Sequence, residues 1–257
     1  MPATPTPRTP SFRLDGRRAL VTGAGRGIGR GAAIALAEAG AAVTLVSRSA
    51  NELAEVAAEI EALGATAEAV VLDVTDLRAV ADALRSRPAF DVLVNNAGGN
   101  RPASFLDVRE EEFDVVFELN VKAAFFVAQA VARRMVEQGV RGSIIMVSSQ
   151  LGHVGAPSRS VYCASKHAVE GLTKAMTLDL APHGIRVNTL CPTFVETPMT
   201  AAMLADPAFR AGVEANIPLG RVARVEDLMG AIRFLACDAS ALMSGTSIVV
   251  DGGWTAR

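Results

Sequence analysis

Tyr162 and Lys166 have the side chains and the spacing for acid–base chemistry on a carbonyl or alcohol group. The segment Tyr162–Lys166 opens a stretch with helical spacing, which places the phenol and the ammonium one turn apart on one face. A phenol, with a pKa of about 10, is a poor acid–base catalyst at neutral pH. A nearby ammonium stabilises the phenolate and brings its pKa toward the working pH. Most pairs with this spacing are ordinary surface pairs, so the assignment depends on the rest of the chain.

A glycine-rich turn near the N-terminus has the composition of a phosphate-binding loop. The turn Gly23–Gly29 follows a short aliphatic run and precedes an alanine-rich helical pattern. Glycine permits a tight turn and close approach of a ligand, and the free N–H groups at a helix start suit a pyrophosphate. The spacing is G-x-x-x-G-x-G, not the common dinucleotide pattern. Alone, it also fits a plain tight turn.

The end of the next apolar run bears on which dinucleotide is bound. NAD sites of this type usually place Asp or Glu there, about 20 residues past the glycines. This chain has Ser47 and Arg48, with no carboxylate before Glu52. Ser47, Arg48 and Arg26 could hold a 2′-phosphate through charge-assisted hydrogen bonds. Both arginines could instead be solvated surface charges. The sequence favours NADP(H), and NAD(H) is possible.

These residues must be positioned by a scaffold, and the apolar pattern predicts which one. Short apolar runs alternate with longer stretches of helical spacing, which indicates a parallel sheet covered on both faces. The expected strands are Ala19–Val21, Ala42–Val46, Ala69–Leu72, Asp91–Val94, Ser143–Val147, Arg186–Leu190 and Ser247–Val250. The clearest helical stretches are Asn51–Leu63, Leu77–Leu84, Glu110–Gln138 and Val161–Pro182. We expect an α/β fold with a doubly wound, mainly parallel seven-stranded sheet.

The carboxyl ends of these strands carry small or polar residues, where ligands sit in such sheets. Beyond the glycine turn and Ser47, they present Asp73, Asn95–Gly98, Ser148–Ser149 and Cys191–Thr193. Turn chemistry alone does not explain six such ends in succession. We therefore predict one ligand site along this edge, in a single Rossmann-type domain spanning residues 12–257.

Composition narrows the class of protein. The chain has 257 residues, a net charge of -2 and 50% hydrophobic residues, so neither nucleic acid nor an anionic membrane is an expected partner. No stretch looks apolar for long enough to span a bilayer. Three widely spaced cysteines fit reduced thiols in a cytoplasm and no zinc site. Residues 1–11 contain four prolines, lack the apolar core of a signal peptide and are expected to be a disordered tail.

Five motifs in order resemble the short-chain dehydrogenase/reductase family, in its branch of about 250 residues, similar to 3-oxoacyl-acyl-carrier-protein reductases. The motifs are Thr22 with the glycine turn, Asn95–Gly98, Asn120, Ser149 thirteen residues before the tyrosine, and Tyr162–Lys166. The match runs from about residue 12 to residue 254. Each motif is weak alone, and together they are specific.

The resemblance implies catalytic roles for four residues. Tyr162 would be the general acid in carbonyl reduction and the base in alcohol oxidation. Ser149 would hydrogen-bond the substrate carbonyl and steady the developing oxyanion, with Ser148 a competing candidate. Lys166 would lower the pKa of Tyr162 and hold the nicotinamide ribose. Asn120 would keep a water that links Lys166 to a proton relay.

The resemblance and the phosphate argument together define the expected cofactor site. Asp73 and Val74 resemble the adenine contact, and Thr193 departs from the family's usual glycine, so a positive φ there would be strained. The expected cofactor-binding residues are Gly23, Arg26, Gly27, Ile28, Gly29, Ser47, Arg48, Asp73, Val74, Asn96, Ala97, Gly98, Tyr162, Lys166, Pro192, Thr193, Val195 and Thr197.

Substrate contacts are expected from two places. The stretch Glu196–Pro218 has amphipathic helical spacing and resembles a lid. The expected substrate residues are Ser149, Gln150, His153, Met199 and Met203. Four arginines could bind a carboxylate from the rim: Arg101, Arg159, Arg210 and Arg221.

The sequence thus predicts an oxidoreductase that interconverts a carbonyl and a secondary alcohol by hydride transfer, with NADP(H) favoured and no metal. One alternative is an NAD-dependent sugar or small-alcohol dehydrogenase. Another, from a different class, is a nucleotide-binding sensor or scaffold without turnover. By resemblance, the long helices Glu110–Gln138 and Val161–Pro182 would build a homotetramer or homodimer around a small-molecule site.

Overall fold

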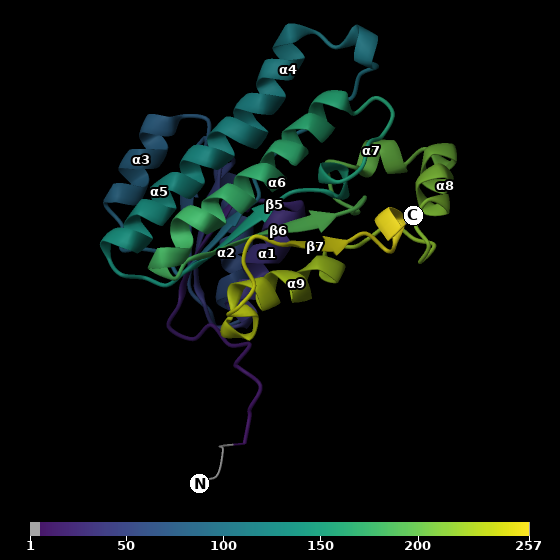
Figure 1. The fold of residues 1–257 in the computed structure, drawn as a ribbon. Helices are drawn as coiled ribbons and strands as arrows, with labels where there is room; N and C mark the ends of the chain where they lie inside the picture. The colour runs from purple at the N-terminus through teal and green to yellow at the C-terminus, as the bar shows by residue number, and fades with distance from the viewer. Residues whose placement is uncertain (1–5, 257) are drawn as a thin grey trace.

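Seven parallel strands form the sheet of the computed structural model, which describes residues 6–256 (Figure 1). The strand order is β3-β2-β1-β4-β5-β6-β7, and every neighbouring pair is parallel. The strands are β1 Arg18–Thr22, β2 Ala42–Ser47, β3 Ala67–Val71, β4 Val92–Asn95, β5 Ser143–Val147, β6 Arg186–Pro192 and β7 Ser247–Val250. The order reverses between β1 and β4, so the predicted doubly wound α/β fold is confirmed.

Helices cover both faces of this sheet (Figure 1). One face carries α1 Gly27–Glu38, α2 Ala50–Ala62 and α9 Glu226–Ala236. The other carries α3 Leu77–Arg85, α5 Ala124–Glu137 and α6 Ser160–Leu180. The remaining helices, α4 Glu110–Phe117, α7 Ala201–Leu204 and α8 Pro207–Ala215, lie toward the carboxyl ends of the strands. These helices and the loops that lead to them therefore gather at the carboxyl ends of the strands.

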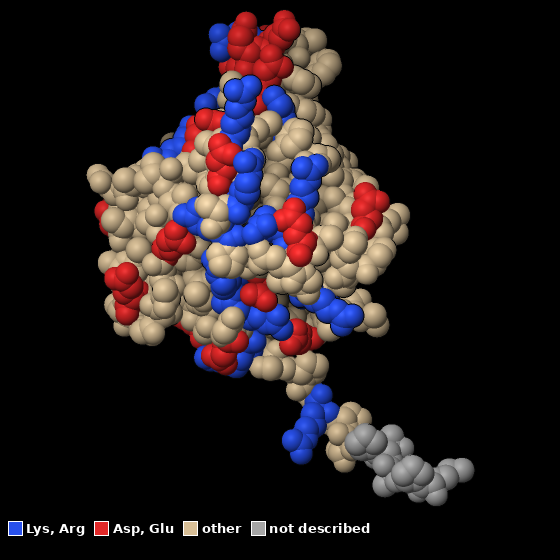
Figure 2. Space-filling view, turned by 90° about the vertical axis from the view of Figure 1, so that its left-hand side faces the viewer, with Lys and Arg blue, Asp and Glu red and all other residues tan. Residues whose placement is uncertain are grey.

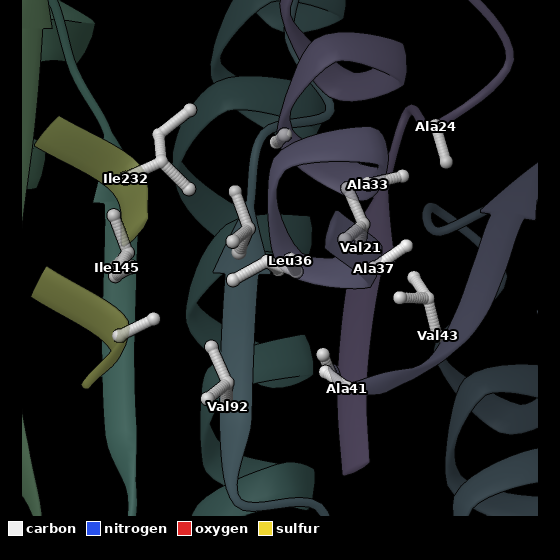
Figure 3. Packing of buried hydrophobic residues seen from close by; sticks show 14 of the residues in the cluster. Val21, Ala24, Ala33, Leu36, Ala37, Ala41, Val43, Val92, Ile145 and Ile232 are labelled. Carbon is white, nitrogen blue, oxygen red and sulfur yellow. The ribbon is translucent and has the colours of Figure 1, made fainter. Parts of the chain in front are cut away.

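The strands and helices form where they do because apolar side chains point to both faces of the sheet. Val21 on β1 and Ile145 on β5 are fully buried, and Leu36 of α1 fills the space between strand and helix (Figure 3). On the same face, small residues such as Ala33 and Ala37 let α1 lie close to the sheet. The rigid layer that results fixes the strand ends, and hence the side chains that follow them.

The N-terminal segment joins the domain at Phe12. Its ring lies 6.2 Å from that of Phe234, and Arg233 donates a hydrogen bond to its carbonyl oxygen. Residues 6–11 are exposed and have no regular secondary structure. The expected disordered tail also includes residues 1–5, which lie outside the described residues, so that expectation and the domain boundary stay predictions.

The expected helix Glu110–Gln138 is interrupted. It comprises α4, a π-helical turn η2 (Glu118–Ala123), and α5. Acidic side chains gather over the start of α4 at the upper end of the molecule in Figure 2, where Glu110, Glu111 and Glu112 occupy the first turn. Carboxylates there interact favourably with the helix dipole. Elsewhere on this face, basic side chains run down the middle, with acidic side chains scattered beside them (Figure 2).

This helical run also corrects the expectation that no stretch is apolar enough to span a bilayer. An 18-residue window within Glu110–Glu137 has a mean hydropathy of 1.5, so the run has the length and composition of a membrane span. The reason is that apolar residues lie on an inner face, with Val127 and Val131, and on an outer face, with Phe125 and Phe126. Core helices of soluble proteins have the same composition, and 44% of the window is buried in the structure.

The lid segment is likewise two helices and not one amphipathic stretch. Asp206 caps α8 by accepting hydrogen bonds from Ala208 and Phe209. Pro207 follows as the first residue of that helix, where its missing N–H is not needed. Proline inside a continuous helix would break it, so α7 ends before this pair.

Candidate active site

Tyr162 and Lys166 lie in the first two turns of α6, as their spacing predicts. The Lys166 ammonium is 5.6 Å from the centre of the Tyr162 ring and donates a 2.9 Å hydrogen bond to the carbonyl oxygen of Val147, at the end of β5. Lys166 is buried, with 5% of its surface exposed. The sheet therefore fixes the ammonium beside the phenol.

Burial shifts the pKa values of both groups toward their neutral forms. It raises the pKa of Tyr162 to about 12, although a hydrogen bond with Ser149 opposes the shift. It lowers the pKa of Lys166 to about 8, against the charge of Glu170. The two pKa values thus lie further apart in the protein than in water, because burial disfavours both the phenolate and the ammonium.

Ser149, and not Ser148, faces the tyrosine. The Ser149 hydroxyl accepts a 3.1 Å hydrogen bond from the N–H of Leu151 and interacts with the Tyr162 phenol. The Ser148 hydroxyl is buried on the other side, where it helps to lower the pKa of Glu170. The geometry supports the serine chosen from its thirteen-residue spacing.

Asn120 lies in the π-helical turn η2 and is 2% exposed. Its side-chain oxygen accepts from the N–H of Gly99 at 2.8 Å, and its NH2 group donates to the Gly99 carbonyl at 2.9 Å and to the Ser165 hydroxyl at 3.1 Å. A π turn shifts the register of the residues that follow and often marks a functional site. Here it brings the amide between the loop after β4 and α6. The side chain is thus fully occupied by protein partners.

The loop after β4 is tied to the glycine turn. The hydroxyl of Thr22 accepts hydrogen bonds from the N–H groups of Asn96 and Ala97, at 2.9 and 3.0 Å. The Asn96 amide in turn donates to the carbonyl oxygen of Thr22 at 2.9 Å. A Cβ on Gly98 would lie 3.3 Å from Asn120 and 3.7 Å from the Lys166 ammonium. The segment Asn96–Gly98 therefore connects the glycine turn to the acid–base pair.

The glycine turn has the features that a pyrophosphate site needs. Gly23 and Gly27 have positive φ angles of 63° and 56°, and a Cβ on Gly29 would lie 2.1 Å from the Gly23 carbonyl oxygen. No side chain caps the start of α1, and no acidic residue lies in its first turn. The N–H groups at this helix start are left for an anion. Ile28, by contrast, packs its side chain against the core.

The residues expected around a 2′-phosphate are close together but are already paired. Arg48 is 79% exposed and lies 3.8 Å from Asp73, and Arg26 is 66% exposed and lies 3.3 Å from Glu52. Exposed pairs of this kind are weak. An incoming phosphate can therefore compete for both guanidinium groups.

Two of their neighbours have local structural roles. The Ser47 hydroxyl accepts from the N–H of Ser49, and Asp73 accepts two hydrogen bonds from Thr75, which lower its pKa. Val74, the next residue, is buried.

The segment after β6 lies against the glycine turn. Thr197 would be 3.3 Å from a Cβ on Gly27, and Val195 is buried in a single bridge with Ala223. Pro192 closes β6 beside Val250. Thr193 is not strained, because Ser158 is the one non-glycine residue with positive φ among residues 6–256.

The expected substrate residues lie at different depths. Gln150 is buried, and its side-chain oxygen has no hydrogen-bond partner within the described chain. Met199 is exposed shortly before the lid helix α7, and Met203 is half-buried within it. His153 is exposed, with its Nε2 3.4 Å from the Cys191 sulfur. Among these residues, Met199 is thus accessible to solvent, whereas Ser149 and Gln150 are buried.

Glu170 is a buried carboxylate that was not identified from the sequence. Burial raises the pKa of Glu170, but hydrogen bonds from neighbours that include Ser247, Cys191 and Thr189 lower it further, so the net shift is downward. His153, Glu170 and Cys191 bring three potential metal ligands within 4.8 Å of one another. The three residues are far apart in the sequence, so the sequence alone does not show that they come together. The signal available was that Glu170 lies one turn after Lys166, on the same face.

Comparisons with known proteins agree with this geometry. A family model described as Enoyl-(Acyl carrier protein) reductase matches residues 23–255. L-xylulose reductase of Homo sapiens is 44% identical over 243 residues, covering 95% of this chain and 98% of that protein.

Two solved structures share the fold, each with a TM-score of 0.92 and each covering 96% of this chain and 98% of the other. One is a short-chain type dehydrogenase/reductase from Mycobacterium marinum, 43% identical. The other is a gluconate 5-dehydrogenase from Burkholderia cenocepacia J2315 in complex with NADP and tartrate, 40% identical.

Proposed function

The chain belongs to the short-chain dehydrogenase/reductase family and is an oxidoreductase, and we propose that it interconverts a ketone and a secondary alcohol of a sugar-like substrate with NADP(H). The observation that carries the proposal is the arrangement of Ser149, Tyr162 and Lys166 at the carboxyl ends of β5 and the start of α6. A nucleotide-binding scaffold has no need of a buried lysine next to a phenol, because its burial is costly.

When bound, the nicotinamide supplies or accepts the hydride at the substrate carbon. In the reductive direction, Tyr162 gives its phenolic proton to the carbonyl oxygen while the Ser149 hydroxyl donates a hydrogen bond to the same oxygen. In the oxidative direction, the Tyr162 phenolate takes the hydroxyl proton. The Lys166 ammonium stabilises that phenolate through its positive charge. Removing one such oxyanion donor costs about 10²–10³ in kcat in other enzymes.

Residues on the chain fit an NADP(H) cofactor. The uncapped start of α1 and the positive-φ glycines would hold the pyrophosphate. The segment Asn96–Gly98 would line the adenosine ribose, and Thr197 would approach from the opposite side. Arg48 and Arg26 would bind the 2′-phosphate by exchanging their weak carboxylate partners for it.

The substrate class is proposed from the relatives. Their names include a reductase of a five-carbon ketose and a dehydrogenase of a six-carbon sugar acid. The family model that matches is described as an acyl-carrier-protein reductase, and within this family we favour a sugar substrate. The sequence-based alternative was an NAD-dependent sugar dehydrogenase, whereas we keep the preference for NADP(H).

We also propose a homo-oligomer formed through the outer face of α4 and α5. Large apolar side chains lie exposed along it: Phe113, Val115, Phe125, Phe126 and Val136. Contiguous exposed apolar side chains of this kind usually mark an interface.

The first experiment is titration of NADPH and NADH into wild type and Arg48→Ala, followed by nicotinamide fluorescence, with Arg85→Ala as a control for lost surface charge. We expect NADPH to bind more tightly than NADH and to lose that advantage only in Arg48→Ala. Turnover is then measured with ketoses and keto acids. If NADH binds as tightly as NADPH in wild type, the cofactor proposal is wrong. If neither cofactor supports turnover of any sugar tested, the substrate class is wrong.

A further inference from the structure

Two of the four rim arginines are neutralised by carboxylates within the protein. Arg210 donates to Glu196 at 2.8 Å and to Glu214 at 3.3 Å. Arg221 makes two hydrogen bonds with Asp227, at 2.7 and 2.8 Å. Such bidentate pairing uses the guanidinium donors that a substrate carboxylate would need. Both guanidinium groups therefore already have charged hydrogen-bond partners within the protein.

Arg101 and Arg159 differ from these two. Among residues 6–256, no carboxylate oxygen lies within 4.0 Å of either guanidinium. Arg101 is exposed and donates only to the carbonyl oxygen of Asn100. Arg159 is half-buried, and burial lowers the pKa of its guanidinium. A solvated charge like that of Arg101 costs little, whereas a partly desolvated charge without a partner is unfavourable.

Arg159 lies between the catalytic tyrosine and the lid. It is the N-cap residue of α6, three residues before Tyr162. One guanidinium nitrogen contacts the sulfur of Met203 in α7 at 3.5 Å, and another donates to the carbonyl oxygen of Ser158 at 3.0 Å. Its charge is a lesser influence on the pKa of Tyr162 and opposes the rise that burial causes.

The partners that Arg159 has are poor ones for a guanidinium. A thioether sulfur is a weak acceptor, and the Ser158 carbonyl is a single neutral oxygen in a residue held at φ 57°. A carboxylate would accept two parallel N–H groups and neutralise the charge at the same time. The position beside Tyr162 and below α7 makes a substrate the natural source of that carboxylate.

We propose that Arg159 binds the carboxylate of the substrate, so that the enzyme acts on hydroxy and keto acids of the sugar series in preference to neutral sugars. This inference rests on the proposed function, because it assumes that the reacting carbon lies at Tyr162. The substrate then spans the space from Tyr162 to α7, with its acidic end at the lid. Hydride and proton transfer take place at the other end of the substrate, beside Tyr162 and Ser149.

The test uses pairs of compounds that differ only at C1, where one has a carboxylate and the other a CH2OH group. These are D-gluconate and D-glucitol, D-galactonate and galactitol, and D-xylonate and xylitol. The kcat/KM for oxidation with NADP+ is measured for wild type, Arg159→Gln, Arg159→Lys and Arg101→Gln. Arg85→Gln serves as a matched control, because it removes an exposed charge on α3.

We expect wild type to prefer the acid of at least one pair. Arg159→Gln should lose roughly 10- to 100-fold in kcat/KM on that acid, the value of a charge-assisted hydrogen-bonded pair. Its kcat/KM on the matching alditol should change by less than about threefold, and Arg159→Lys should recover part of the loss.

Three results of the kinetic assays would overturn the proposal. The first is a wild type that prefers every alditol to its acid. The second is an equal loss on acid and alditol in Arg159→Gln, which indicates a structural role. The third is an acid-specific loss in Arg101→Gln in place of Arg159→Gln. Failure of the proposed function is different, since no compound would be oxidised. In that case, the three acids are titrated by calorimetry into NADPH-loaded wild type and Arg159→Gln. Equal affinity for the acids in the two proteins counts against the proposal.

Discussion

The side chain of Asn120 and the peptide groups of Gly99 are joined by two hydrogen bonds, 2.8 and 2.9 Å long, that fix the loop after β4 to the π-helical turn. The pairing resembles that between two peptide groups, with one donor and one acceptor on each side. Because Asn120 is buried, no water can take over its hydrogen bonds to Gly99 when the side chain is changed.

Asn120→Asp should disrupt this pairing. The new carboxylate oxygen would face the Gly99 carbonyl where an N–H group now donates, so a buried acceptor is left unsatisfied. We expect the free energy of unfolding to fall by about 2–3 kcal/mol, and turnover to fall at least tenfold because the loop borders Lys166. Urea denaturation and steady-state kinetics measure the two effects.

Asn216→Asp is the matched control, because the exposed Asn216 amide also donates to a glycine carbonyl, that of Gly212. Its stability should change by less than about 1 kcal/mol. Equal losses in the two variants would mean that burial of the Asn120 pair is unimportant.

Tyr162→Phe tests the general acid. The phenylalanine ring fills the same space but cannot donate or accept the proton, so turnover should fall by about 10³ or more while NADPH affinity stays within about threefold. Stopped assays give the residual rate, and fluorescence titration gives the affinity. Turnover close to that of wild type would show that another group delivers the proton.

Lys166→Met should stabilise the cofactor-free protein at pH 7. Burial lowers the pKa of Lys166 from 10.5 to about 8. Below pH 8 the lysine is charged in both the folded and unfolded states, and the cost of burying that charge is fully present. Between pH 8 and 10.5 the unfolded chain binds more protons than the folded one, so wild-type stability rises with pH.

We therefore expect the free energy of unfolding of Lys166→Met to exceed that of wild type by about 1–2 kcal/mol at pH 7. This figure allows for the lost hydrogen bond to Val147. The difference should shrink toward pH 10, and catalysis should be lost. Thermal unfolding across this pH range follows the trend. A variant less stable than wild type at pH 7 would contradict the assigned cost.

Gly29→Ala tests the tight contact below the glycine turn. The added Cβ would lie 2.1 Å from the carbonyl oxygen of Gly23, so α1 must move away from β1. We expect a loss of about 2 kcal/mol or more in stability and weaker cofactor binding. Gly230→Ala is the control, because a Cβ there meets nothing within 4 Å in the middle of α9. That change should stabilise by about 0.5–1 kcal/mol. Similar effects at both glycines would remove the steric argument.

Val115→Glu tests the proposed interface. Val115 is exposed on α4 together with the aromatic residues of the outer face, and a glutamate there would place a charge inside an apolar contact. Light scattering after size-exclusion chromatography should show a smaller assembly than wild type. Leu63→Glu, at an exposed position after α2, should leave the mass unchanged. An unchanged mass for Val115→Glu would place the interface elsewhere.

Much of the fold was predictable because the strands are short aliphatic runs, and β1, β2, β4, β5 and β6 are almost wholly buried. Boundaries shifted by only a residue or two, as in β4, expected at Asp91–Val94 and found at Val92–Asn95. The π-helical turn was not predictable, since the change in backbone hydrogen bonding leaves the apolar spacing of Glu110–Gln138 almost unchanged. The split between α7 and α8 was predictable from Asp206 and Pro207, an N-cap followed by a helix-starting proline.

The site was predictable where chemistry depends on residues close in the sequence, as in Tyr162–Lys166. It was not where the chemistry depends on tertiary contact. Four rim arginines look alike in the sequence, and only the folded chain separates Arg159 from those with carboxylate partners. The environment of Glu170 likewise depends on the position of β6 and β7 against α6.

The two ends of the domain leave it at opposite edges. Leu14 is bonded to Ala39 after the last turn of α1, below the amino ends of the strands, whereas Trp254 packs on Phe194 beside the lid (Figure 1). If the protein were attached to a solid support through its N-terminal segment, the entrance to the active site would therefore still face the solution. A fusion partner joined to the C-terminal end would crowd that entrance and slow the exchange of cofactor and substrate. Immobilised or fused forms of this enzyme should thus be attached by the N-terminal end.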